Sequence, residues 1–391
     1  MSPEISYLYS IPYIIIILLL LLLFFKGNEY LNDEKRFLNI RIATISLLLL
    51  FIGLRGHVYS DWSSYYPFFE DLPTIWSGDI LNEFKTASME PGFIIYSVLI
   101  KSFFPNYFIW VFINTAIDIW VLDKIFKKYT KYYVLAFIVF FVMNGLMVEF
   151  NLYRNAKAII LFILSLEYLK NRKFIPYFLI NLLGFTFHYS ALLFLPLYFI
   201  LDREIPRSIV YLIFIVSNIV FIFHLKWINL VLGDIVSLLN VSLISEKTLG
   251  YADSASEVVF SLGYFERVIS FLVFTILYKR LVALNSINRI FYNVFLFYLI
   301  FIFCFSEVMV FSERFSYLFC FAYWFLYPNV YTLISSKMNK SIFLSIFILF
   351  LFLRLAAGNK NLLSKYDNLL FGIENYDDRS LEFEQYSRFL N

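Results

Sequence analysis

Long runs of apolar residues, separated by short polar segments, recur along the whole chain. The first run covers about residues 11–25, a second about 37–54, and the last about 342–357. A helix needs about 20 apolar residues to cross the hydrocarbon core of a bilayer, so runs of this kind are typical of membrane spans. They lack the alternation of barrel strands, and open sheet edges are not tolerated in lipid. The pattern therefore predicts helices throughout.

Residues 151–196 predict a helical hairpin in the middle of the chain. One apolar run starts at Arg154 and ends near Lys170, the polar turn 171–173 follows, and a second run returns to His188. Each run would be roughly 22 to 25 Å long, which brings His188 back to the level of Arg154. An arginine near hydrocarbon is costly, so we expect Arg154 to meet a charge or a polar cavity.

The distribution of Lys and Arg orients the predicted helices. We place the basic connections on the cytoplasmic side; they are residues 124–131, 171–173, 202–207, 279–289 and 337–340. The outward-facing turns are then those near Arg154 and His188, the segment 224–257, and Ser312-Glu313-Arg314. We expect function on this extracytoplasmic side.

Three polar segments are predicted outside the cytoplasm, attached to a single integral membrane domain of residues 1–391. Segment 55–90 is an acidic loop, segment 224–257 contains an interfacial helix over residues 227–239, and segment 358–391 is an interfacial tail. In the tail, Tyr366, Leu369, Leu370 and Ile373 have helical spacing and predict a short interfacial helix.

Residues 91–122 are predicted to cross the membrane once. A polar break at 101–106 interrupts this region, and two full crossings would place the basic segment 124–131 outside. We therefore expect one crossing that is kinked or preceded by a short partial helix.

Composition supports a polytopic membrane protein. Hydrophobic residues make up 61% of the chain and charged residues 16%. The two cysteines lie in apolar runs and suit packing. The sequence lacks a glycine-rich phosphate loop, a CxxC and an HExxH motif, so we predict no nucleotide-binding domain, no nucleic-acid partner, no metal and no cofactor. We expect an all-α fold of about 12 transmembrane helices.

Several charged residues gather at the predicted outer face. They are Arg55, His57, Asp61, Glu90, Arg154, Lys157, His188, Glu266, Arg267, Glu313 and Arg314. Many arginines with few carboxylates suit a diphosphate better than a metal, because a guanidinium binds phosphate oxygens with two parallel donors and keeps its charge.

Each of these residues also has a plain structural explanation. An arginine can extend to the lipid head groups, and Arg267 or Arg314 can pair with the preceding glutamate. Asp61 and Glu90 can each cap the helix that follows. His188 can be a buried, hydrogen-bonded histidine. These alternatives remain open at the level of sequence.

An ordered set of segments carries a resemblance to a known family. The segments are LRGHVYSDWSSYY, MEPGFIIYSVLIK, NLYRNAKAIILFILSLEYLKNRK, GFTFHYSALLFLPLY and SERFSYLF. Together they resemble the EpsG-type branch of bacterial Wzy polysaccharide polymerases, from Leu54 to about Tyr331. Family members typically have Arg-Gln where this chain has Arg154-Asn155, and a glycine where it has Ser60.

This resemblance implies a GT-C-like, metal-independent glycosyltransferase with an extracytoplasmic cavity in the bacterial cytoplasmic (inner) membrane. It would transfer a growing glycan from undecaprenyl diphosphate to the terminal sugar of a lipid-linked repeat unit, as in O-antigen synthesis. Membrane lipid and a chain-length regulator are further expected partners. Arg154 and Arg314, with Arg55 and Arg267, are assigned to the diphosphate. The acceptor hydroxyl is assigned to Asp61, Glu90 or His188.

Other functions share part of this pattern. An O-antigen ligase-like glycan transferase would also use outer arginines and a histidine. A polysaccharide or lipid transporter would need two related halves or broken helices around a midplane site, and the sequence shows no internal repeat. An acyltransferase would rest on a single histidine at the membrane face.

Overall fold

The computed structural model describes residues 5–77, 89–228 and 260–390. The regular secondary structure in these ranges is helical. The chain divides into two compact units, of which the first comprises Met1–Leu195 with Tyr327–Asn391 and the second Pro196–Leu326. The helix expected over residues 227–239 falls almost wholly outside the described residues.

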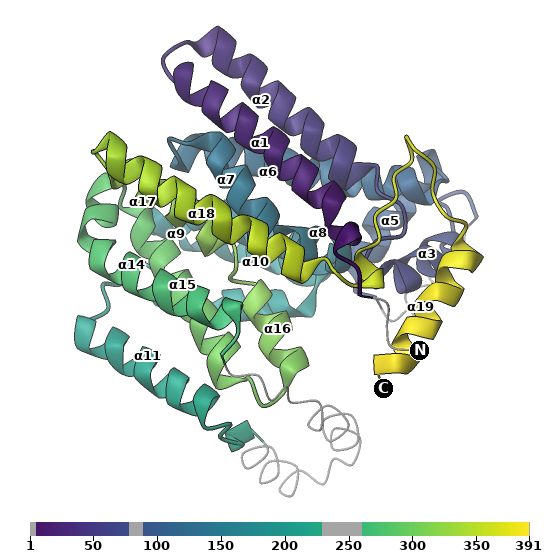
Figure 1. Cartoon of the computed structure of the whole chain (residues 1–391). Coiled ribbons are helices and arrows are strands. Elements are labelled where there is room, and N and C mark those ends of the chain that lie inside the picture. Colours follow the sequence, from purple (N-terminus) through teal and green to yellow (C-terminus); the bar gives the residue numbers. More distant parts are fainter. Residues whose placement is uncertain (1–4, 78–88, 229–259, 391) are drawn as a thin grey trace, which may run out of the picture. The chain divides into compact units, whose positions relative to one another are not determined.

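The first unit contains most of the helices (Figure 1). They are α1 (Ile11–Glu29), α2 (Glu34–Leu48), α3 (Trp62–Asp71), α5 (Pro91–Phe103), α6 (Tyr107–Tyr129), α7 (Tyr133–Phe140), α8 (Leu146–Asn151), α9 (Tyr153–Lys170), α10 (Phe174–Phe187), α18 (Lys337–Gly358) and α19 (Tyr376–Leu390). A π-helical turn, Leu49–Gly53, extends α2, whereas the segment Phe141–Gly145 after α7 contains a kink at Met143 and Asn144. Short 3-10 turns cover Tyr7–Ser10, Tyr189–Phe194 and Leu362–Ser364.

The second unit is a smaller helical group. It begins with the 3-10 turn Pro196–Phe199 and contains α11 (Arg207–Ile222), α14 (Leu262–Leu284), α15 (Ile287–Cys304) and α16 (Met309–Tyr317). The chain returns to the first unit through α17 (Ala322–Leu333).

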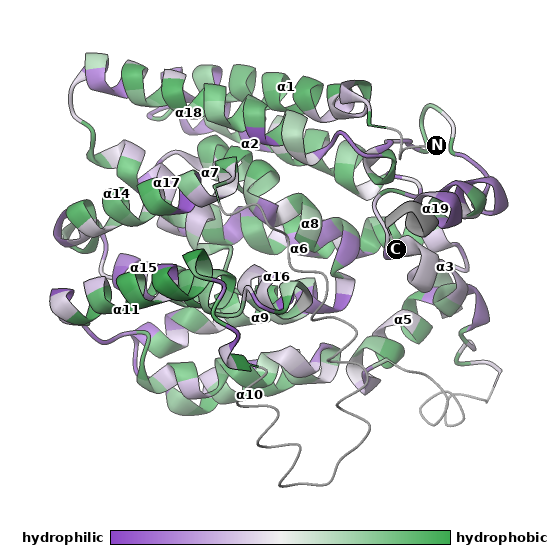
Figure 2. Cartoon of the chain, turned by 60° about the horizontal axis from the view of Figure 1, so that its bottom comes forward, coloured by the Kyte–Doolittle hydropathy of each residue, from purple (hydrophilic) through white to green (hydrophobic). Residues whose placement is uncertain are grey.

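Among the described residues, five helices are long and apolar enough to cross a membrane. They are Tyr7–Glu29, Glu34–Gly53, Tyr133–Asn151, Ile287–Cys304 and Lys337–Gly358. Figure 2 shows the apolar character of α1 and α18 along their length. The first, second and last apolar runs of the sequence are thus confirmed as helices. The total of about 12 spans and the GT-C-like arrangement remain predictions.

The polar break at residues 101–106 separates a short helix from a long one. α5 has 13 residues, which is about 20 Å, whereas α6 has 23. The Asn106 side chain starts α6 by accepting hydrogen bonds from the amides of Phe108 and Ile109 at 2.9 and 3.1 Å. This division matches the expected short partial helix before a longer one, and a single crossing by this region remains a prediction.

The predicted hairpin is confirmed in α9 and α10. Nδ2 of Asn181 donates to Oγ of Ser165 at 2.9 Å between the two helices. Gly184 faces Ala158 across the pair, and a Cβ there would make an ordinary contact of 3.6 Å with the Cα of Ala158. The polar turn between Lys170 and Phe174 reverses the chain, so both ends of the hairpin return to one side of the unit.

The prediction of a short helix around residues 366–373 is wrong. This segment is a turn held by long-range hydrogen bonds, and the tail helix is α19. The Tyr366 hydroxyl donates to the Phe51 carbonyl at 2.7 Å, and Nδ2 of Asn368 donates to the Leu50 carbonyl at 2.9 Å. These bonds satisfy carbonyl groups near the end of α2 and override the helical spacing of the apolar residues.

Candidate functional site

Glu90, Arg154 and His188 meet in the first unit. Nη1 of Arg154 lies 2.6 Å from Oε2 of Glu90, and Nε2 of His188 lies 3.9 Å from Oε1 of the same carboxylate. The Glu90 side chain is 2% exposed, whereas Arg154 keeps 22% and His188 20%. The cluster is therefore a buried acid with a cation and a histidine that both reach the surface.

Three separate helix ends supply this cluster. Glu90 directly precedes α5, Arg154 is in the first turn of α9, and His188 follows α10. Glu90 makes no capping bond to its own helix, so its carboxylate is available to the hairpin. Its Oε1 also accepts the backbone N–H of Tyr189 at 3.3 Å. Glu90 thus joins the start of α9 to the end of α10.

Tyr65 and Glu90 fix the Arg154 guanidinium from two directions. Nε of Arg154 donates to the Tyr65 hydroxyl at 3.4 Å, and Tyr65 packs edge-on against Tyr153 with ring centroids 4.6 Å apart. Burial raises the pKa of Tyr65 to about 12, so the hydroxyl stays neutral. Within the part of the chain that the structure describes, Arg154 donates its side-chain hydrogen bonds through Nε and Nη1. The Nη2 edge is the one left to face a ligand.

Hydrogen bonds fix the orientation of His188. Its Nδ1 lies 2.7 Å from Oγ of Ser190 and accepts the Ser190 backbone N–H at 3.1 Å. Nδ2 of Asn155 donates to the same Oγ at 3.4 Å. Because Nδ1 accepts a backbone N–H, this network assigns the proton of neutral His188 to Nε2, on the Glu90 side. Asn155 therefore also contacts the site.

Asp61 lies beside this cluster, in the loop before α3. The amides of Ser60 and Asp61 donate to Oδ1 of Asn151 at 3.1 and 3.3 Å, which ties the loop to the end of α8. The Asp61 carboxylate is half-buried, makes no capping bond to α3, and acts electrostatically on Tyr65. The structure thus brings Asp61 near the Tyr65–Arg154 pair.

Arg55 has a different environment from that expected of a diphosphate ligand. It is 1% exposed. Its guanidinium donates to the Tyr153 hydroxyl at 2.8 Å, the Glu149 carbonyl at 2.6 Å and Oγ1 of Thr115 at 3.2 Å, and also to the Ile52 carbonyl. With its Nη donors directed at protein oxygens, Arg55 organises the core behind the cluster.

Arg267 and Arg314 belong to the second unit. Arg267 lies on α14, where its Nε donates to the Tyr298 hydroxyl at 3.2 Å and its charge acts on Glu313. Glu266 accepts from Oγ of Ser270 at 2.7 Å. Arg314 is exposed on α16. Their assignment to a diphosphate remains a prediction.

Lys157 and Asp118 form a buried ion pair that was not predicted from the sequence. Nζ of Lys157 lies 2.7 Å from Oδ2 of Asp118, and the side chains are 7% and 2% exposed. The same Nζ donates to the Asn114 carbonyl at 2.8 Å. An acid inside an apolar helix is costly and usually has a charged partner. The position of Asp118 in the sequence could therefore have predicted a buried ion pair. Lys157 follows Arg154 by one helical turn, which ties this part of α9 to α6.

Metal ligands do not gather in the part of the chain that the structure describes. In residues 5–77, 89–228 and 260–390, no group of three or more His, Cys, Asp or Glu side chains could hold a metal ion. The candidate site is instead an arginine with a carboxylate, a histidine and a tyrosine. Such a set can bind an anion through Arg154 and position a hydroxyl near Asp61.

Comparisons with known proteins agree with the resemblance in the sequence. The family model described as the EpsG family matches residues 38–368, which include every candidate site residue. No curated protein and no solved structure matches the chain. The apolar helices and the extent of the family match lead to one identification: this membrane protein belongs to the EpsG family, the family of Wzy-type polysaccharide polymerases.

Proposed function

We propose that this protein polymerises a bacterial surface polysaccharide on the extracytoplasmic side of the cytoplasmic membrane. It transfers the growing glycan from undecaprenyl diphosphate to the terminal sugar of a lipid-linked repeat unit. The observation that carries the proposal is the Glu90–Arg154–His188 cluster, within a chain whose family match covers the whole candidate site.

Arg154 binds the diphosphate leaving group in this mechanism. Breaking the bond between sugar and diphosphate places negative charge on the departing oxygen, and a fixed cation stabilises that charge without reorganisation. Glu90 and Tyr65 hold two edges of the guanidinium, so the Nη2 edge is oriented before substrate arrives. In this proposal the cation that meets the leaving group comes from the protein and not from a metal.

Asp61 is the base that takes the proton from the acceptor hydroxyl. Glu90 is committed to Arg154, and His188 uses the lone pair of Nδ1 to accept the Ser190 amide. The Asp61 carboxylate is half-buried, accepts a hydrogen bond from Oγ of Ser60 at 3.2 Å and acts on the nearby Tyr65, and a carboxylate positioned in this way can take a proton from a hydroxyl. His188 then serves to position Glu90. Arg267 and Arg314 are proposed as further contacts of the lipid-linked substrate.

The test uses purified protein in nanodiscs with lipid-linked repeat units, and gel analysis of product length. Wild type should give a ladder of polymers in the presence of a chelator. Arg154→Lys should give only unpolymerised units, whereas Arg172→Lys, at the opposite end of the same hairpin, should resemble wild type. A full ladder from Arg154→Lys would remove Arg154 from the site. In a parallel reaction that also contains lipid A core, transfer to that acceptor without chain growth would identify a ligase instead.

A further inference from the structure

An exposed apolar tip lies in the C-terminal segment 358–391. Leu369, Leu370 and Phe371 are 38%, 58% and 90% exposed, respectively. The tip is nevertheless well defined, because the Leu369 amide donates to the Leu54 carbonyl at 2.9 Å and the Phe371 amide to the Asn368 carbonyl at 3.0 Å. An ordered turn that presents three large apolar side chains outward is unusual for a surface in water and indicates an apolar partner.

A groove of about 650 Å³ separates this tip from two membrane-spanning helices. One wall is the start of α1, the second is the end of α2 with its π-helical turn, and the third is the segment 366–372. Ile15 on α1 and Leu50 after α2 are 49% and 46% exposed. The groove and the tip thus form one apolar surface, and the volume is in the range of small-molecule sites.

We infer that this groove binds an acyl chain of a bilayer phospholipid, and that the tip Leu369–Phe371 inserts into the membrane beside it. α1 and α2 belong to spans with mean hydropathies of 2.8 and 1.7, so hydrocarbon surrounds their exposed faces. Among the described residues that line the groove, Asp367 alone carries a charge. An acid repels a multiply charged diphosphate more strongly than a zwitterionic head group, which favours a phospholipid such as phosphatidylethanolamine over the polyprenyl diphosphate of the proposed substrate.

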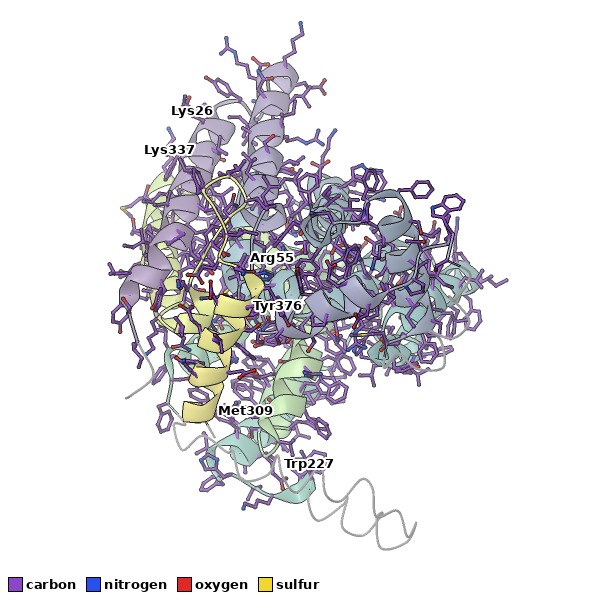
Figure 3. All side chains as sticks on the ribbon, turned by 90° about the vertical axis from the view of Figure 1, so that its right-hand side faces the viewer. Lys26, Arg55, Trp227, Met309, Lys337 and Tyr376 are labelled. Carbon is purple, nitrogen blue, oxygen red and sulfur yellow. The ribbon has the colours of Figure 1, made fainter. Side chains whose placement is uncertain are left out.

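Lipid at this groove would hold the tail against the loop that carries Asp61. Nε of Arg379 on α19 donates to the His57 carbonyl at 3.1 Å, and the rings of Tyr376 and Tyr66 stack with centroids 4.4 Å apart. Figure 3 shows Tyr376 at the start of the yellow helix α19, with Arg55 labelled just above it. The backbones of Arg55 and Asn368 also pair. An anchored tip therefore restrains the tail that packs on this loop.

The first experiment measures the depth of the tip in the membrane. Cys304 is replaced by serine and Cys320 by alanine. A single cysteine is then introduced as Phe371→Cys, Leu22→Cys or Asp378→Cys, and each variant carries a nitroxide label in nanodiscs. Leu22 is a lipid-facing position on α1 and Asp378 an exposed position on α19. The label at residue 371 should be accessible to oxygen, like residue 22. If the label at residue 371 is instead accessible to a water-soluble nickel complex, as we expect for residue 378, the tip does not insert into the membrane.

The second experiment identifies the occupant and keeps the native cysteines. Wild-type protein is reconstituted with phosphatidylethanolamine carrying a diazirine in one acyl chain, and cross-linked peptides are mapped. Cross-links should concentrate on residues 12–16, 47–51 and 366–372. Leu50→Trp, which fills the groove, should reduce them severalfold, and Leu22→Trp should not. Uniform labelling of all lipid-facing helices would overturn the site, and displacement by equimolar polyprenyl diphosphate would overturn the choice of phospholipid.

Discussion

The carboxylate of Glu90 and the guanidinium of Arg154 lie 2.6 Å apart, although 64 residues separate them in the chain. The pair joins the start of α5 to the start of α9, and His188 approaches the same carboxylate from the end of α10. Since Arg154 keeps part of its surface exposed while Glu90 is buried, the pair fixes the cation and leaves one edge of it available.

Arg154 and Glu90 should act as one unit. We expect Arg154→Lys to reduce polymerisation by about 10²-fold, the usual effect of losing one donor to a developing negative charge. Glu90→Gln should also reduce the rate of polymerisation, because the Arg154 guanidinium then loses the carboxylate that orients it. The double variant should be little worse than either single variant. Rates of repeat-unit addition in nanodiscs provide the measurement, and additive losses would show that the residues act separately.

Asp61 and Arg154 should affect different steps. Asp61→Asn should lower single-turnover rates while donor affinity stays near wild type, because the base acts only on the acceptor hydroxyl. Arg154→Ala should weaken donor binding as well, since the diphosphate is charged before reaction. Donor affinity and single-turnover rate are measured for both variants. An equal loss of donor binding would mean that Asp61 only helps to orient the arginine.

Lys157→Met should destabilise the protein by about 3–5 kcal/mol, because it leaves Asp118 buried without its cation. Lys157→Met/Asp118→Leu should recover most of this loss. The matched control is Lys128→Met, whose ion pair with Glu167 is 48% exposed on both sides and should contribute less than about 1 kcal/mol. Thermal unfolding in detergent micelles compares the variants. A double variant as unstable as Lys157→Met would contradict this account.

Stability should fall in two steps on acidification. Burial lowers the pKa of His57 to about 4, and the charge of Arg379 acts in the same direction. The unfolded state therefore takes up a proton that the folded state resists, and stability decreases as pH falls from about 6.5 towards 4. Burial opposes ionisation of Glu382, but hydrogen bonds from Lys365 and Arg379 outweigh it and lower the pKa. Its contribution is lost as pH falls below the ordinary glutamate pKa.

Unfolding temperatures measured from pH 7.5 to 3.5 separate the two groups. His57→Gln should flatten the upper part of the profile, and Glu382→Gln the lower part. An unchanged profile in His57→Gln would show that another group titrates in that range.

The two ends of the hairpin should be accessible from the same side of the membrane. Single cysteines at Asn151 and Ser190 should react with an impermeant reagent from the extracytoplasmic side, because α9 and α10 form an antiparallel pair. A cysteine at Arg172, in the polar turn, should react only from the cytoplasmic side. Labelling of residues 151 and 190 from opposite sides would rule out the predicted topology.

The sequence by itself determined the class of protein and several candidate residues. In lipid a long apolar run can satisfy its backbone groups only as a helix, which is why α1, α9, α10 and α18 could be located in advance. The cost of an arginine near hydrocarbon singled out Arg154, and the length of the hairpin placed His188 beside it. These inferences need only local pattern and chain length.

The tertiary structure decided which groups meet. Helical periodicity indicates that a face is buried but not what covers it, so the pairing of Glu90 with Arg154 could not be predicted. For the same reason Arg55, expected at the surface, is enclosed by oxygens from three other segments. Hydrogen bonds between the tail and the end of α2 replaced the expected helix at 366–373, because satisfying the carbonyls at that helix end outweighs the preference of a short apolar segment for helix.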